Sequence, residues 1–226
     1  MIRFSSLPVC AILTTGLLAC GSNTTTSTGS TPDAANGTTV KSALDLVPLD
    51  NGVSGWLVDT STTKTKGARA ASASSEAEAV GLIDGSAAPY YRAPYTPKMF
   101  LWQNFTNDTM PAAPPPLGAA LMLYILEMPS EEQAKGLYAE LLNGSGTDYT
   151  RLAGTDKDWQ PPSPLVGKDS RIQDTGAQWW INFYKGVYYA EVMLFPSYGP
   201  EPEYVTSHPD LKKEALRFAQ AIASGM

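Results

Sequence analysis

Apolar residues recur at helical spacing in three parts of the chain, near residues 75–91, 130–143 and 209–224. The clearest of these predicted helices, 130–143, places its apolar side chains on one stripe: Ala134, Leu137, Tyr138, Leu141 and Leu142. Ser130 and Gln133 have the spacing of a capping box at its start. In the helix near 75–91, glycines interrupt the pattern, so we expect a break at Asp84-Gly85.

Other segments are typical of strands, because β-branched and aromatic residues dominate them. The predicted strands are 53–60, 98–107, 119–128, 170–176, 178–186 and 187–195. The segment 119–128 is apolar on both faces, which predicts a central position in a sheet. Lys185-Gly186 is a plausible tight turn between the last two strands.

Most of these strands follow one another through loops that are too short for a helical crossover. Such an order favours antiparallel pairing. The sequence therefore predicts an α+β domain, with a mainly antiparallel sheet and about three helices packed on it.

The N-terminus predicts export. Residues 1–19 combine a positive start, which contains Arg3, with an apolar run that is shorter than the roughly 20 residues of a membrane-spanning helix. Leu17-Leu18-Ala19-Cys20 resembles the lipobox of bacterial lipoproteins. The resemblance implies cleavage between Ala19 and Cys20 and a lipid such as palmitate on Cys20. The alternative is an ordinary secreted protein whose cysteine lies at the boundary by chance.

We accordingly divide the chain into a signal peptide (1–19), a lipidated cysteine with a tether (20–43) and a single α+β domain (44–226). The tether is rich in Ser, Thr, Gly and Asn, a composition that forms flexible linkers. Two or more acyl chains on Cys20 would anchor the protein stably in a membrane. Gly21 takes the place of the aspartate that retains Gram-negative lipoproteins in the inner membrane, so the resemblance favours the outer membrane in such a host.

Three motifs of the domain occur in the same order in a family of uncharacterised exported bacterial proteins. "VGLIDGSAAPYY" (80–91) resembles their Leu-x-x-x-Ile-[Asn/Asp]-Gly-x-Ala-x-x-Tyr segment. "MPSEEQAKGLYAEL" (128–141) and "WWINFYKGVYYAEV" (179–192) are similar to a helix and an aromatic hairpin of the same family. The resemblance implies a shared exported α+β fold and no particular activity.

Composition narrows the possible chemistry. The formal net charge is -6 and no basic cluster stands out, so we expect no nucleic-acid partner. Both cysteines lie in the first twenty residues and there is a single histidine, so we expect neither a disulfide framework nor a transition-metal site, and no cofactor.

The sequence assigns no catalytic residue. The single histidine, His208, precedes the last predicted helix and is interpreted as a loop residue rather than a catalytic base. The acidic side chains that could serve a hydrolase are Asp84, Glu127, Glu191, Glu201 and Glu203. No pattern pairs any two of them in space, so we predict a protein that is not an enzyme.

Aromatic residues crowd one predicted hairpin. Alternation places Trp179, Ile181 and Phe183 on one face of the strand. The other face carries Trp180, Asn182 and Tyr184, which either lie under a helix or are exposed. Trp180, Tyr184 and Trp102 are therefore the candidates for a surface that binds a glycan or a protein of the cell envelope.

The sequence thus predicts a lipid-anchored envelope lipoprotein that acts as a non-catalytic binding or interaction module. Two alternatives remain open at this point: a carboxylate-dependent envelope hydrolase and a purely structural envelope component.

Overall fold

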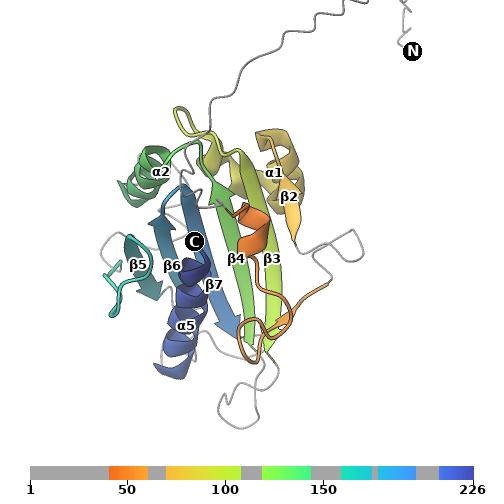
Figure 1. Ribbon diagram of the computed structural model, residues 1–226, viewed down its shortest axis with the longest axis vertical. Helices are drawn as coiled ribbons and strands as arrows, with labels where there is room; N and C mark the ends of the chain where they lie inside the picture. Colours follow the sequence, from red (N-terminus) through yellow and green to blue (C-terminus); the bar gives the residue numbers. More distant parts are fainter. Residues whose placement is uncertain (1–40, 61–69, 108–118, 144–158, 175–177, 197–208) are drawn as a thin grey trace, which may run out of the picture. The chain divides into compact units, whose positions relative to one another are not determined.

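Antiparallel strand pairing organises the domain. A computed structural model describes residues 41–60, 70–107, 119–143, 159–174, 178–196 and 209–226. Within them, seven strands form one sheet in the order β1-β3-β4-β7-β6-β5, and β2 pairs with β3 beside β1 (Figure 1). The strands are β1 (Leu57–Val58), β2 (Ala71–Ala73), β3 (Met99–Asn107), β4 (Ala119–Glu127), β5 (Asp169–Asp174), β6 (Trp179–Lys185) and β7 (Tyr188–Pro196).

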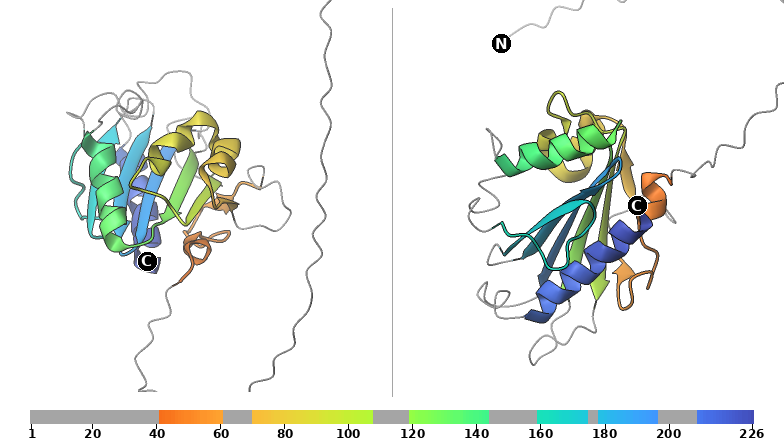
Figure 2. Two further views of the ribbon diagram at one scale, coloured as in Figure 1. Left: turned by 90° about the horizontal axis from the view of Figure 1, so that it is seen from above. Right: turned by 60° about the vertical axis from the view of Figure 1, so that its left-hand side comes forward.

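Helices cover both faces of this sheet, as the right-hand view of Figure 2 shows. On one side lie α1 (Glu76–Ile83), the 3-10 helix η2 (Asp84–Tyr91) and α2 (Glu131–Asn143). On the other lie the short 3-10 helix η1 (Ala43–Leu46) and the C-terminal α5 (Pro209–Gly225). We call these the α1–α2 face and the α5 face.

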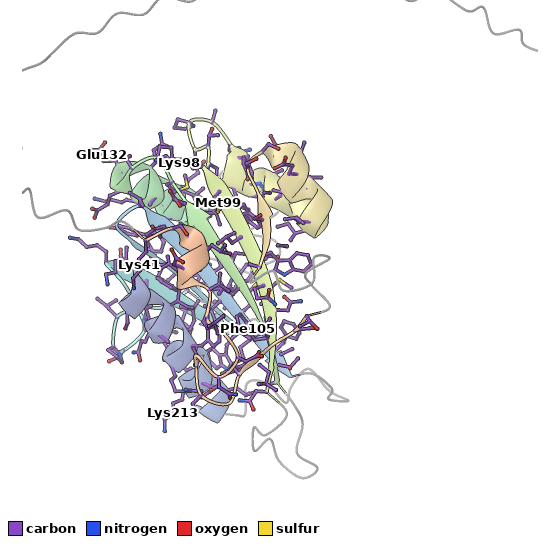
Figure 3. All side chains as sticks on the ribbon, turned by 45° about the vertical axis from the view of Figure 1, so that its right-hand side comes forward. Lys41, Lys98, Met99, Phe105, Glu132 and Lys213 are labelled. Atoms are coloured by element: carbon purple, nitrogen blue, oxygen red, sulfur yellow. The ribbon has the colours of Figure 1, made fainter. Side chains whose placement is uncertain are left out.

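The α5 face is a continuous apolar core. Phe218 of α5 is fully buried and packs against Phe105 (labelled in Figure 3), with ring centroids 5.0 Å apart. The Trp56 ring meets Phe218 edge-on at 5.6 Å, and its Nε1 donates a hydrogen bond to Glu214 at 2.7 Å. Burial of these rings removes much apolar surface from water, which fixes α5 on the sheet.

The α+β prediction is confirmed. The three predicted helices correspond to α1 with η2, to α2 and to α5. The first of them changes from α to 3-10 geometry at Asp84, at the expected break. The predicted central strand is β4, which lies between β3 and β7.

Several details differ from the sequence predictions. The predicted strand 53–60 is shortened to β1, because residues 53–55 form a bend and a turn. The β6–β7 turn consists of Gly186 and Val187 rather than Lys185-Gly186, because Lys185 still pairs with Tyr188. Gly186 has φ +56°, a conformation that glycine adopts without a Cβ clash. Neither η1 nor the edge strand β2 was predicted. The segment around β2 is rich in Ala and Ser, a composition that is typical of a loop.

The predicted capping box of α2 is only half formed. The Gln133 backbone N–H donates to the Ser130 hydroxyl at 3.2 Å, as the prediction requires. The Gln133 side-chain oxygen is buried and accepts no hydrogen bond in the described part of the chain, so the reciprocal contact is missing.

No helix among the described residues is both long and apolar enough to span a membrane. The predicted signal peptide (1–19), Cys20 and the tether up to residue 40 lie outside those residues.

Candidate functional site

A row of polar side chains crosses the α1–α2 face from strand to strand. Arg171 of β5 is directly opposite Asn182 of β6, which is opposite Glu191 of β7, which is opposite Tyr124 of β4. Residues that face each other in this way share one face of a sheet. All four side chains are buried, so the row places two charged groups inside the domain.

Glu191, at the middle of this polar row, is completely buried and well supplied with donors. Its carboxylate accepts hydrogen bonds from the Trp180 indole N–H at 3.1 Å and from the Tyr189 hydroxyl. The Asn182 amide donates in turn to the Tyr189 hydroxyl at 3.0 Å. The carboxylate is thus held by a hydrogen-bond network and has no access to solvent.

The surrounding phenols are kept neutral. Burial raises the pKa of Tyr90 well above its usual value, and the nearby Glu191 charge adds to this effect. The same two causes, burial first, raise the pKa of Tyr124. Neutral phenols keep their protons, so they remain able to donate hydrogen bonds to the buried carboxylate.

Arg171, at the end of the row, lies among aromatic rings. Its Nη1 donates to the Tyr138 carbonyl of α2 at 2.9 Å, and its Cζ lies 4.4 Å from the centre of the Tyr138 ring. The Trp159 ring lies 5.1 Å from the same carbon. A two-way backbone bridge between Gln160 and Ile172 fixes the segment next to Trp159 along the edge of the sheet.

Sequence reasoning did not single out Arg171. A signal was present, because Ile172 occupies the α5 face and alternation then directs Arg171 to the opposite one. What the sequence lacked was the strand order, which alone places Arg171 in register with Asn182 and Glu191.

A second feature of the α1–α2 face is a strip of half-exposed residues in the middle of the sheet. It consists of Trp102, Asn104, Thr106, Ala120, Met122 and Phe195. The alternate residues of the same strands, such as Leu101, Phe105 and Leu121, are buried on the α5 face. The Trp102 indole N–H donates to the Asn104 side-chain oxygen at 2.8 Å, which holds the ring along its strand. We call this set the half-exposed strip.

The three predicted surface residues do not form one exposed patch. Trp180 and Tyr184 are only 5% and 6% exposed, because α2 and Trp159 cover them. Trp102 is half-exposed on β3, and strands β4 and β7 separate it from β6. Of the three, Trp102 is the most exposed, and it packs at the margin of the core on this face.

The candidate carboxylates do not converge either. Glu191 lies on the α1–α2 face, whereas Glu127 is opposite Tyr188 on the α5 face and accepts a hydrogen bond from the Ala43 N–H at 3.3 Å. Glu201, Glu203 and His208 lie outside the described residues, and Asp84 is described only as the start of η2. Within the described ranges, no group of acidic, histidine or cysteine side chains is arranged to hold a metal ion.

Comparison of the chain with protein-family models, curated proteins and solved structures gives no match. Any functional conclusion therefore depends on the residues described above.

Proposed function

We propose that this protein is an exported lipoprotein, anchored to a membrane through lipid on Cys20, whose domain is a non-catalytic binding module for a glycan or protein of the cell envelope. The anchor is supported by Leu17-Leu18-Ala19-Cys20 at the end of a short apolar run. A polar stretch follows it and leads to a domain whose first described element begins at Ala43. In a Gram-negative host, Gly21 favours the outer membrane.

The anchor is tested by labelling cells with radioactive palmitate. Cys20→Ser should abolish labelling and release the protein from the membrane fraction, because the acyl chains supply the membrane affinity. Cys10→Ser is the matched control, since that cysteine lies in the predicted signal peptide and should leave labelling unchanged. Equal labelling of wild type and Cys20→Ser would refute the anchor.

The binding role is supported by one observation above all: the half-exposed strip lies on interior strands of the sheet. Trp102 and Asn104 are flanked by β4 on one side and, at Trp102, by β2 on the other. Met122 is directly opposite Asn104. A fixed indole beside an amide and a thioether offers stacking, hydrogen bonding and adaptable apolar contact to a partner.

The binding role is tested by co-sedimentation of the purified full-length protein with insoluble cell-wall glycan, and by photocrosslinking from position 122 in intact cells. We expect Trp102→Ala to weaken binding about tenfold or more, as substitution of a central aromatic contact usually does. Leu165→Ala is the control, because Leu165 is an exposed apolar residue (56%) outside the strip. Binding and crosslinking that are unaffected by Trp102→Ala would refute this role and favour a structural component.

A further inference from the structure

Arg171 has hydrogen-bond donors that nothing in the described part of the chain uses. The residue is 4% exposed, and both Nε and Nη2 are buried without a hydrogen-bond partner. No described carboxylate forms an ion pair with it, although Asp169 lies two residues away on the same face of β5. Nη1 donates to the Tyr138 carbonyl, and the guanidinium also interacts with the Tyr138 hydroxyl.

The two unused groups lie on the same edge of the guanidinium. In arginine, the Nε–H and Nη2–H bonds point the same way and match the two oxygens of a carboxylate. Arg217 on α5 provides a direct comparison, because its Nε donates to Glu214 Oε2 at 2.9 Å and its Nη2 donates to Glu214 Oε1. The edge that Glu214 fills at Arg217 is buried and makes no hydrogen bond at Arg171.

The contacts of Arg171 with the Tyr138 and Trp159 rings and with the Tyr138 carbonyl leave its Nε and Nη2 donors without hydrogen bonds. Burial of a cation without a carboxylate bonded directly to it is unfavourable, and each buried donor that makes no bond adds to the cost. An apolar side chain of similar length would fill the same space under α2 without that cost. A buried guanidinium with two unbonded donors on one edge is the arrangement expected of a group that binds an anion.

The surroundings favour a singly charged ligand. Asp169 and Glu191 lie on the same face as Arg171, and their negative charges oppose the entry of a dianion such as phosphate. Tyr138 and Trp159 present ring faces to the guanidinium, and Trp159 is the half-buried one of the two. An aromatic or apolar body attached to the anion would lie well against these rings.

We propose that Arg171 is the anion-binding residue of a site for an organic monocarboxylate, which enters on the Trp159 side and takes both carboxylate oxygens onto the Nε–Nη2 edge. The site involves neither the lipid anchor nor the half-exposed strip. It therefore goes beyond the proposed function, and either proposal can fail without the other.

The test is a titration of the ¹⁵N-labelled full-length protein in detergent, followed through the arginine Nε–H signals by NMR. The probes are benzoate, acetate, inorganic phosphate and benzamide, which has the shape of benzoate without its charge. Benzoate should shift the Arg171 signal saturably and benzamide should not. The Arg217 signal serves as an internal control and should not move, since Glu214 occupies its edge.

Arg171→Lys keeps the charge but removes the two-pronged edge, so it should lower benzoate affinity at least tenfold. If that variant does not fold, Trp159→Ala replaces it. Loss of the ring should lower the affinity for benzoate at least tenfold and leave the affinity for acetate unchanged. Absence of any saturable carboxylate shift at Arg171 would overturn the proposal. Phosphate binding as tight as benzoate binding would overturn the assignment to a monocarboxylate.

Discussion

The two faces of the sheet are both covered by helices, yet they are built from different residues. The α5 face is filled mainly by aliphatic and phenylalanine side chains, together with Trp56, Trp179 and Tyr188. Its buried polar residues Gln103, Asn107 and Ser170 are neutral. The α1–α2 face is rich in tyrosine and contains both buried charged residues of the described chain, Arg171 and Glu191. The same sheet thus supports an apolar core on one side and a polar one on the other.

This difference separates the residues that hydrophobic packing explains from those that it does not explain. Hydrophobic burial accounts for most of the α5 face, because its large apolar side chains gain from leaving water. Burial alone does not account for Arg171 and Glu191, since charged groups lose hydration when they are buried. The α1–α2 face is therefore where binding is to be sought, and the predictions below test whether the two faces differ as described.

The largest effect is expected on the α5 face. Phe218→Ala should lower the free energy of unfolding by about 3–5 kcal/mol, because it leaves a cavity beneath Trp56 and Phe105. Urea unfolding followed by circular dichroism measures it. Leu165→Ala, at an exposed site, should change stability by less than about 0.5 kcal/mol. A similarly small loss for Phe218→Ala would mean that α5 does not hold this face together.

A smaller effect is expected from the polar row. Glu191→Gln keeps the shape but turns one acceptor oxygen into a donor, which then faces either the Trp180 indole N–H or the Tyr189 hydroxyl. The free energy of unfolding should fall by about 1–3 kcal/mol.

The matched control for that substitution is Glu127→Gln on the other face. The free energy of unfolding should change there by less than about 0.5 kcal/mol, because the amide oxygen of Gln can still accept the hydrogen bond from the Ala43 N–H. Urea unfolding of both variants makes the comparison. A Glu191→Gln protein more stable than wild type would show instead that the charge of Glu191 costs more than its hydrogen bonds contribute.

Alkaline pH should destabilise the α1–α2 face. Burial raises the pKa of Tyr138 to about 12, against the opposing charge of Arg171, and burial followed by the Glu78 and Glu76 charges raises the pKa of Tyr91 to about 12. Below pH 10 these phenols are neutral in both states. Between about pH 10 and 12 the unfolded chain ionises first, so stability falls with rising pH.

Unfolding midpoints across a pH series, with tyrosinate absorbance recorded in parallel, measure this dependence. Tyr138→Phe should flatten the fall above pH 10 and leave the midpoint near neutral pH almost unchanged. An equally steep fall in Tyr138→Phe would assign the pH dependence to other groups and weaken the contrast between the faces.

Much of the fold could be predicted because its elements have strong local patterns. The apolar stripe on α2 fits only a helix, and the apolar run of β4 fits only a strand that is buried on both faces. The strand β2 could not be predicted, since Ala71–Ala73 has no alternation and is extended only because it pairs with β3. The turn was misplaced by one residue because the pairing of Lys185 with Tyr188 depends on both strands.

The candidate site was less predictable. Alternation correctly grouped Trp180, Asn182 and Tyr184 on one face, but it does not reveal whether a helix covers that face. Trp102 was singled out for its ring, whereas the strip around it appears only once β3, β4 and β7 are aligned. Arg171 could be recognised only with the same alignment. The reason to single it out is that its Nε and Nη2 make no hydrogen bond, and this is visible only in the structure.

The smallest predicted effect concerns the start of α2, the helix that covers Arg171 and Tyr184. Ser130→Ala should lower the free energy of unfolding by about 1 kcal/mol, because the Gln133 backbone N–H loses its acceptor. Gln133→Ala should change it by less than about 0.5 kcal/mol, since the side-chain oxygen makes no hydrogen bond within the described chain. Urea unfolding of the two variants separates these outcomes. Equal losses would indicate a complete capping box and a more firmly fixed α1–α2 face, in which case entry of a ligand beneath α2 would require a larger local opening.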